Sequence, residues 1–576
     1  MRLQSCSSLK VLHGRTNRCT PLQVVLRHPL LLHQKCFSYN QARTSVTRNT
    51  VLLAGSGGMA MSSEPGHASL EYWFGRSGRY EKLLVDGTGT GDGQAAPVQP
   101  VAQSDLKALL GSLDPLHRTW ATNTRFKAKP GELCLLPDPM GGVARVLLGI
   151  GPASTAPWPY AALAKLPGGT YRLTPPQGNG SSATDSSPAA AADPAAAYRA
   201  ALGFLLGHYA FERYKTAKRV KGAAEAEAAE GDGYGGAVGS CSDVEEVEES
   251  KARLVWPEGC DRAQVLALVR AFVWCRDLIT TPAEDLGPQH LAAEAQALAV
   301  THGSVFSLLQ GEQLLEANYP AIHTVGRASY RPPVLATLEW FPPGEDNPAS
   351  LPLLALVGKG VCFDTGGLNL KSGASMKNMK KDMGGAALVL ALAHVVMSCR
   401  LRVRLLVLVP AVENSVAGNS YRPLDVLQTR AGITVENGNC DAEGRLILSD
   451  ALTEAASRRP DLILDAATLT GAARTALGAE LPAVFTNDDA TWRELEAAAE
   501  AESDHLWRLP LHAPYRRQLD SKVADLASTG AGDGLAGAIL AALFLQEFVK
   551  GAPRWIHIDT SAFTAGSAVG PGRPEG

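Results

Sequence analysis

The chain has 576 residues, of which 45% are apolar and 19% are charged, with 54 Lys and Arg against 57 Asp and Glu. This length exceeds that of one ordinary domain, so we expect at least two domains. The composition is typical of a globular protein. No uninterrupted apolar run reaches the roughly 18–20 residues that cross a bilayer, which argues against a membrane protein.

The first 63 residues contain no Asp or Glu but eight Lys or Arg. A basic, acid-free start is typical of an organellar transit peptide, and a disordered basic tail is the alternative. We therefore expect residues 1–62 to direct the protein to the plastid stroma or the mitochondrial matrix, with the cytoplasm as second choice. The remaining chain has 46 basic residues against 57 acidic ones, so it should repel phosphate backbones and bind no nucleic acid.

Residues 63–218 predict a small N-terminal α/β domain, because short apolar runs such as 143–150 alternate with helical stretches such as 195–212. Residues 219–252 are rich in Gly, Ala and Glu. A charge run of this kind is usually a solvated linker or insertion rather than a binding face. We place the domain boundary there, with a larger domain at residues 253–576.

The larger domain alternates short β-like runs with helical runs. The β-like runs are 353–357, 404–409, 461–464 and 555–558, and the helical runs are 261–278, 383–397, 445–458 and 537–549. This alternation predicts a mostly parallel sheet that is covered by helices on both faces. Functional side chains of such a sheet gather on loops at one of its edges.

The stretch Asn439–Leu446 places two carboxylates, Asp441 and Glu443, one residue apart, and Arg445 follows. It lies between a β-like run and a helix, where side chains and free backbone carbonyls can converge. Oxygen ligands of this kind suit hard divalent cations. A solvated acidic turn is the alternative for this stretch alone.

A second acidic cluster lies upstream. Asp364 is on a Gly-rich loop after a β-like run, Asp382 precedes an apolar helix, and Lys359 and Lys371 lie close by. Four carboxylates in one pocket repel one another unless cations hold them, and two divalent ions about 3.5–4 Å apart would do so and activate water for hydrolysis. These motifs contain no His, which argues against a mononuclear zinc site.

The polar motifs, in chain order, are VGKGVCFDTGGLNLK, MKKDMGG, PAVEN, NCDAEGRLILSDAL and DAATLTGAA. Their order and spacing resemble the M17 leucyl aminopeptidase family of cytosol-type dimetal exopeptidases, from about Arg276 to Pro574. The resemblance implies a hydrolase that removes N-terminal residues, preferably leucine-like ones, from peptides through a metal-bridging water. It also implies a homohexamer and two divalent metal ions per subunit, Mn²⁺ or Zn²⁺ and possibly Mg²⁺.

Roles are carried over from the family residue by residue. The resemblance implies these metal ligands: Lys359, Asp364, Asp382 and Glu443 for one ion, and Asp364, Asp441 and Glu443 for the other. Lys371 would stabilise the oxyanion, and Arg445 would hold a bicarbonate that acts as general base. The implied substrate-binding residues are Met379, Asn439, Thr468 and Gly471.

Three further residues were weighed against structural roles. Cys440, next to the ligand Asp441, stands where the family usually has Thr. Cys is nearly isosteric with Thr, so we expect the site to survive, with a metal preference altered by the softer thiolate. We interpret His394 as a packed core residue and Asp465 as a buried hydrogen-bonding group.

Two other classes of function compete with the aminopeptidase. A catalytically silent structural or chaperone-like homologue is expected to have lost ligands, whereas all seven positions named for the metals, the oxyanion and the bicarbonate are present. A dinuclear phosphoesterase usually brings His ligands, and these motifs have none.

Overall fold

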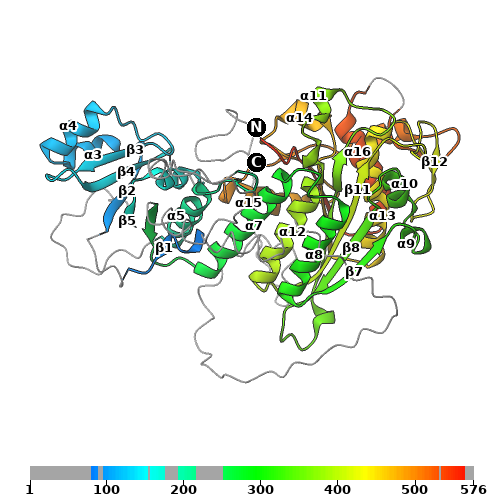
Figure 1. Ribbon diagram of the computed structural model, residues 1–576, viewed down its shortest axis with the longest axis horizontal. Helices are drawn as coiled ribbons and strands as arrows, with labels where there is room; N and C mark the ends of the chain where they lie inside the picture. The colour runs from blue at the N-terminus through cyan, green and yellow to red at the C-terminus, as the bar shows by residue number, and fades with distance from the viewer. Residues whose placement is uncertain are drawn as a thin grey trace, which may run out of the picture.

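The computed structural model describes residues 80–87, 95–152, 156–174, 193–215, 251–530 and 534–564. These residues form a smaller N-terminal lobe and a larger C-terminal lobe, with helix α7 (Arg262–Thr280) at their junction (Figure 1). The predicted transit peptide, residues 1–62, lies outside the described residues, as does the predicted linker except for its last two residues.

The N-terminal lobe has a six-stranded sheet in the order β1-β6-β5-β2-β4-β3, in which only the β3–β4 pair is antiparallel. Its strands are β1 (Leu84–Val85), β2 (Ala96–Ala102), β3 (Leu133–Pro137), β4 (Val143–Gly151), β5 (Gly169–Leu173) and β6 (Ala252–Val255). Its helices are α3 (Leu106–Ser112), α4 (Pro115–Asn123), η2 (Trp158–Lys165) and α5 (Pro194–Gly207). The predicted α/β character of this region is confirmed, although α5 ends five residues earlier than expected, with His208 as its C-cap.

Strand β6 pairs with β5 and β1 in the N-terminal sheet. Sequence analysis placed the start of the catalytic domain at residue 253, inside this strand. The pairing partner of a four-residue strand depends on which edge is free, and the sequence does not reveal that. We therefore propose a boundary between β6 and α7.

The larger lobe has a nine-stranded sheet in the order β16-β15-β18-β14-β9-β11-β8-β7, with β10 beside β11. Its strands are β7 (Val305–Gln310), β8 (Val334–Trp340), β9 (Leu353–Gly358), β10 (Gly360–Asp364), β11 (Arg404–Asn414), β14 (Leu462–Ala467), β15 (Ala483–Thr486), β16 (Trp507–Arg508) and β18 (Trp555–Asp559). The four central strands, β18, β14, β9 and β11, are parallel, while β8, β7 and β15 pair in antiparallel fashion. The prediction of a mostly parallel sheet is confirmed at its centre.

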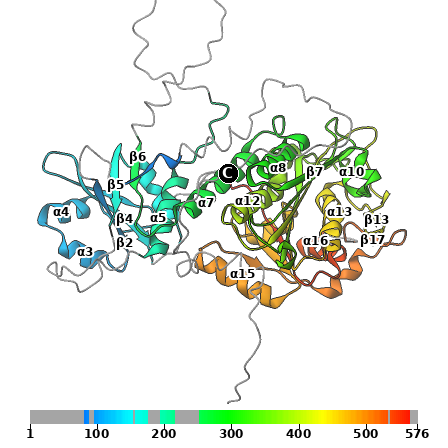
Figure 2. The ribbon, with the colours of Figure 1, turned by 90° about the horizontal axis from the view of Figure 1, so that it is seen from below.

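Helices cover both faces of this sheet, and Figure 2 shows α12 and α13 on opposite sides of the strands. One layer contains α7, α8 (Pro288–His302), α12 (Gly384–Ser398) and α15 (Asp489–Ala501), and the other contains α10 (Pro320–Gly326), α13 (Glu443–Ser457) and α16 (Gly537–Gln546). In β9, Leu354 and Leu356 join the first core, whereas Ala355 and Val357 join the second. Burial on both faces explains why this strand is apolar throughout.

Shorter elements complete the larger lobe. They are the sheet β12 (Val426–Leu427), β13 (Val435–Glu436) and β17 (Leu526–Ala527), the helices α9 (Gln313–Glu316), α11 (Gly373–Met376) and α14 (Gly471–Leu477), and the 3-10 turns η3 (Pro348–Ser350), η4 (Met379–Met383), η5 (Cys440–Ala442), η6 (Ala513–Leu519) and η7 (Glu547–Val549). The helix expected over residues 537–549 is thus α16 followed by the turn η7.

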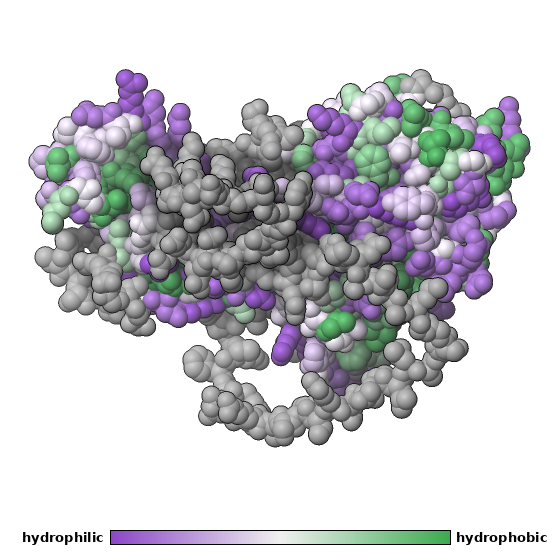
Figure 3. Space-filling model, in the orientation of Figure 1, coloured by the Kyte–Doolittle hydropathy of each residue, from purple (hydrophilic) through white to green (hydrophobic). Residues whose placement is uncertain are grey.

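Within the described residues, the stretch Met379–Ser398 is long and apolar enough to cross a membrane, although 78% of its most apolar window is buried inside the protein. The stretch joins η4 to α12, and its apolar run is interrupted by Lys380, Lys381 and Asp382. Its burial is that of a core helix. Hydrophilic and hydrophobic side chains are interspersed on the visible face of both lobes (Figure 3).

Candidate metal centre

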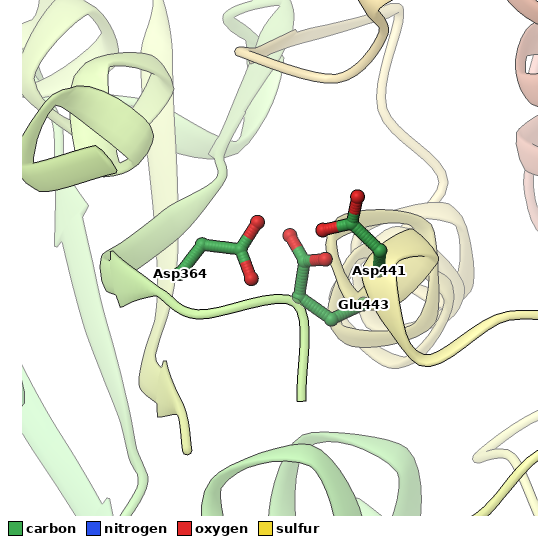
Figure 4. A group of neighbouring side chains, drawn as sticks. All are labelled: Asp364, Asp441 and Glu443. Atoms are coloured by element: carbon green, nitrogen blue, oxygen red, sulfur yellow. The ribbon is translucent and has the colours of Figure 1, made fainter. Parts of the chain in front are cut away.

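The predicted ligands converge at the carboxyl edge of the central parallel strands, where open α/β sheets place their sites. Asp364 ends β10, Asp441 lies in η5, and Glu443 begins α13. Their side chains point toward one another (Figure 4). One carboxylate oxygen from each lies within 4.8 Å of the others, a spacing that suits a shared cation.

Lys359 connects β9 to β10 and is buried beside two carboxylates. Its Nζ lies 2.7 Å from Asp382 Oδ2 and 2.9 Å from Glu443 Oε1, and it donates a hydrogen bond to the carbonyl of Thr468 at 2.9 Å. Burial by itself would lower the pKa of Lys359, but the charges of Asp382, Glu443 and Asp364 outweigh it and raise the pKa above its ordinary value.

Gly444 makes room for this amine. A Cβ at position 444 would lie 2.5 Å from Lys359 Cε and 2.8 Å from its Nζ. A side chain there would displace Lys359, so the glycine that follows Glu443 is needed to keep the amine in place.

Lys371 occupies the opposite side of the group. Its Nζ lies 2.8 Å from Asp364 Oδ2 and donates a short hydrogen bond to Asp441 Oδ1. Burial opposes the charge of Lys371, but both carboxylates overcome this and raise its pKa. The Asp441 side chain is 32% exposed, so this side of the site faces solvent.

The two lysines do not fully neutralise the carboxylates of the site. Burial, followed by repulsion from Asp382, raises the pKa of Asp364 to about 6, and burial likewise raises the pKa values of Asp382 and Asp441. Glu443 Oε2 is buried and accepts no hydrogen bond from any described residue. A buried carboxylate oxygen without a donor is costly unless a cation binds it, so the donor set fits divalent metal ions.

Two residues that sequence analysis did not assign hold the ligand loops together. Asn414, at the end of β11, donates from Nδ2 to Asp364 Oδ1 at 2.9 Å and to the carbonyl of Cys440 at 3.0 Å. Tyr421 donates from its hydroxyl to the same carbonyl at 2.7 Å. Asn414 ends the PAVEN motif, which was noted but given no role. The position of Tyr421 depends on a loop whose path the sequence does not indicate.

Cys440 is fully buried, and its thiol lies away from the carboxylate group. Its Sγ accepts a hydrogen bond from Asn437 Nδ2 at 3.2 Å and donates to the carbonyl of Tyr421 at 3.4 Å. Burial raises the pKa of this thiol and keeps it protonated. The structure therefore gives no support to the expected influence of a sulfur ligand on metal preference.

Arg445 is a buried cation with an unused donor. Its Nη1 donates to the carbonyl of Ser528 at 2.7 Å, while its Nε is buried without a hydrogen-bond partner among the described residues. Burial lowers the pKa of Arg445 to about 10, partly offset by Glu443 and Asp559. A buried guanidinium with a free N–H can bind a small anion.

The predicted substrate-binding residues occupy different positions around the carboxylates. Thr468 donates from Oγ1 to Asp382 Oδ1 at 2.7 Å, and Asn439 accepts a hydrogen bond from the amide of Asp441 at 2.8 Å. Met379 begins η4, the turn that carries Asp382, and Gly471 begins α14, just after Thr468. No atom lies within 4 Å of a Cβ built at Gly471, so the chain leaves open space there.

The two structural interpretations agree with the packing. His394 is 3% exposed, and its Nδ1 lies 3.1 Å from Nε2 of His302. Asp465 is fully buried and binds Trp555 Nε1 and His557 Nδ1, each at 2.6 Å. Neither residue takes part in the carboxylate group.

Known proteins resemble this chain over both lobes. The profile of the cytosol aminopeptidase family, catalytic domain, matches residues 273–574, and that of the M17 aminopeptidase N-terminal domain matches residues 96–225. Peptidase B of Cronobacter sakazakii is 46% identical over 301 residues, which are 51% of this chain and 70% of that protein. Peptidase B of Klebsiella pneumoniae is 43% identical over 56% of this chain and 76% of that protein.

Solved structures agree. The cytosol aminopeptidase of Coxiella burnetii superposes with a TM-score of 0.72 at 38% identity, covering 86% of this chain and 96% of that one. The bottromycin maturation enzyme BotP in complex with Mn superposes with a TM-score of 0.66 at 31% identity, covering 82% and 93%. Sequence motifs, fold and carboxylate geometry all lead to the same conclusion: the chain belongs to the M17 family of cytosol aminopeptidases and is a metal-dependent aminopeptidase.

Proposed function

We propose that this aminopeptidase releases N-terminal residues, preferably leucine-like ones, from peptides, with two divalent metal ions held by Lys359, Asp364, Asp382, Asp441 and Glu443. One observation carries the metal assignment. Glu443 Oε2 is buried, with no donor among the residues that the structure describes, at the point where three carboxylates converge. Divalent ions bound there would supply Lewis acidity and a nucleophile at neutral pH.

The burial of the ligands supports a division of the site into two halves. Lys359, Asp382 and Glu443 form an inner half with side chains at most 5% exposed. Asp441 and Lys371 form an outer half that solvent reaches. Glu443 of the inner half and Asp364, which contacts Lys371 of the outer half, would serve both ions.

Lys359 must be neutral to bind a metal. Without metals its ammonium balances Asp382 and Glu443, which explains its raised pKa. A divalent ion in that place would repel the ammonium and lower the pKa of the amine. Metal uptake should therefore release a proton, as it does whenever a ligand must be deprotonated.

Lys371 and Arg445 would act on the substrate side. Lys371 is a cation at the solvent-facing edge of the carboxylates, where it could stabilise an oxyanion that forms on the peptide carbonyl. The free Nε of Arg445 supports a small anion such as bicarbonate, which would accept the proton of the attacking water.

The identity of the metal ions, the oligomeric state and the cellular location are further parts of this proposal. We propose Mn²⁺ or Zn²⁺, with Mg²⁺ as a further candidate, and the Mn complex of the related BotP supports manganese. We also propose that the protein assembles as a homohexamer and that its substrates are peptides. We propose that residues 1–62 direct the protein into an organelle, the plastid stroma or the mitochondrial matrix. The cytoplasm, which the name of the matched family suggests, is the second choice.

Metal analysis combined with a panel of aminoacyl amides tests this function. We expect two divalent ions per chain and the highest kcat/KM on leucyl amide among apolar, charged and prolyl substrates. Two bound ions without turnover on any substrate would favour the silent homologue. Turnover that survives complete metal removal would contradict the metal assignment.

A further inference from the structure

A cavity of about 500 Å³ lies where the two lobes meet. Its walls come from η2 and α5 of the N-terminal lobe and from α7, α12 and α15 of the larger lobe. Figures 1 and 2 both place α5 and α7 at this junction. Its volume is typical of pockets that bind small molecules, and such pockets often form between domains.

This cavity is separate from the metal centre. Helix α12 starts two residues after Asp382 and reaches the cavity with Val395, Ser398 and Cys399. The lining residue Val395 lies eleven residues along α12 from Gly384, so a rise of ~1.5 Å per residue separates the two sites by at least about 16 Å. A ligand in the cavity would therefore not contact the carboxylates.

Most of the cavity wall is apolar. Its main apolar side chains are Leu202, Leu268, Phe272, Leu401, Leu495 and Leu506. Apolar surface in an open cavity is in contact with water, so a ligand with an apolar body would gain by covering it.

The charged groups of the cavity all have the same sign. Its lining includes the carboxylates of Asp261, Glu502 and Asp504, and no Lys, Arg or His among the described residues. Asp261 accepts a hydrogen bond from the amide of Gln264 as the N-cap of α7. Arg199 is close enough to act on Glu502 through its charge, but its guanidinium forms its ion pair with Asp193, at 3.6 Å. Glu502 thus forms no ion pair within the described residues.

A phenol accompanies this carboxylate. Tyr198 of α5 lines the same cavity, and Glu502 lies close enough to contribute, after burial, to the raised pKa of its hydroxyl. The hydroxyl therefore stays protonated and can donate or accept a hydrogen bond. An anionic ligand would meet three carboxylates here, whereas an ammonium group would find an unpaired one.

We propose that this interlobe cavity binds a small amphipathic organic cation, an aryl- or alkylammonium whose apolar body packs on the leucine and phenylalanine side chains and whose ammonium pairs with Glu502 beside Tyr198. A zwitterionic amino acid is disfavoured, because its own carboxylate would lie among those of Asp261 and Asp504.

Three probes of matched shape test this site by isothermal titration calorimetry on the metal-loaded enzyme. They are 4-phenylbutylammonium, the neutral 4-phenylbutan-1-ol and the anionic 4-phenylbutyrate. We expect the ammonium to bind at least about tenfold more tightly than the alcohol, as a charge-assisted hydrogen bond implies, and the carboxylate not to bind. Equal affinity for ammonium and alcohol would overturn the proposal.

Matched variants locate the binding site. Glu502→Gln should weaken ammonium binding about tenfold, whereas Glu500→Gln, the same change at an exposed position of α15 outside the cavity, should leave it unchanged. Ala498→Leu, which fills the cavity, should weaken both the ammonium and the alcohol. An amine could also bind at the metal centre, so Asp441→Asn is the remaining control. Binding that Asp441→Asn abolishes and Glu502→Gln preserves would overturn the proposal.

Discussion

The inner and outer halves of the metal centre use the same chemistry in different surroundings. In each half, a lysine ammonium lies between two carboxylates. The inner Lys359 and Asp382 are 3% and 5% exposed, whereas the outer Lys371 and Asp441 are 14% and 32% exposed. Solvent screens the outer charges and gives ions and peptides access to them, while the inner charges depend almost entirely on one another. The inner half should therefore hold its ion more firmly, and the outer half should meet the substrate.

The largest effect should come from removing one carboxylate of each half. Asp382→Asn should cost the inner ion and nearly all turnover. It should also destabilise the metal-free protein by up to ~3–5 kcal/mol, because it breaks a buried ion pair. Asp441→Asn should cost only the outer ion and should alter the free energy of unfolding by less than ~1 kcal/mol. Elemental analysis measures the metal content of the two variants, and urea unfolding measures their stability. Equal losses of metal and of stability in both variants would contradict the distinction between the halves.

Lys371→Ala should give the next largest effect. We propose that this ammonium acts on the substrate rather than binding a metal ion, so both ions should remain. Loss of one transition-state donor typically lowers kcat by about 10²–10³, while KM changes much less, because ground-state binding is retained. Steady-state kinetics beside metal analysis checks this. A variant that has lost its metals would show that Lys371 instead holds the outer ligands in place.

Tyr421→Phe tests the hydrogen bonds that hold the ligand loops together. The variant removes the 2.7 Å hydrogen bond to the Cys440 carbonyl but keeps the ring in the core. Loss of an outer-shell contact of this kind typically lowers metal affinity or activity by about 10–100-fold. The outer ion should be affected, because Cys440 directly precedes Asp441. Competition with a chelator measures the affinity, and an unchanged affinity would mean that Asn414 alone is sufficient to hold the carbonyl.

Cys440→Thr should give the smallest effect. Since the thiol bonds to Asn437 and Tyr421 rather than to a ligand, the threonine hydroxyl can form similar contacts. We expect the Mn²⁺-to-Zn²⁺ activity ratio to change less than about twofold, whereas an exchange of a ligand sulfur for oxygen would alter metal selectivity strongly. Activity assays of both metal forms provide the test, and a large change in the ratio would place the sulfur at the ions.

The sequence predicted the contacts that are local in the chain and missed those between distant segments. Asp441, Glu443 and Arg445 belong to one short motif, so their proximity follows from local geometry. The central parallel strands were likewise predicted, because burial on both faces makes them mostly apolar, and β9 apolar throughout. Asn414 and Tyr421 act through contacts between loops that are distant in the sequence, and no local pattern shows which carbonyl they meet.

The interlobe cavity was not predictable for a related reason. Its apolar wall consists of ordinary helix residues such as Leu268 and Leu495, whose patterns indicate only buried faces. The cavity exists because α5, α7 and α15 do not close completely around one another. The same limitation affected β6, whose pairing with the N-terminal sheet depends on the arrangement of strands rather than on its own residues.

The close approach of Gly444 to Lys359 has a consequence for mutational scanning. Since a Cβ at position 444 would lie 2.8 Å from the amine, any substitution there should move Lys359 and abolish activity, although Gly444 has no side chain that could bind a metal or a peptide. A saturation library scored by activity alone would therefore rank this glycine together with the five proposed ligands. A mutational scan of this protein will therefore mark residues that leave room for the ligands as well as the ligands themselves. Metal content must be measured beside activity to distinguish these two kinds of residue.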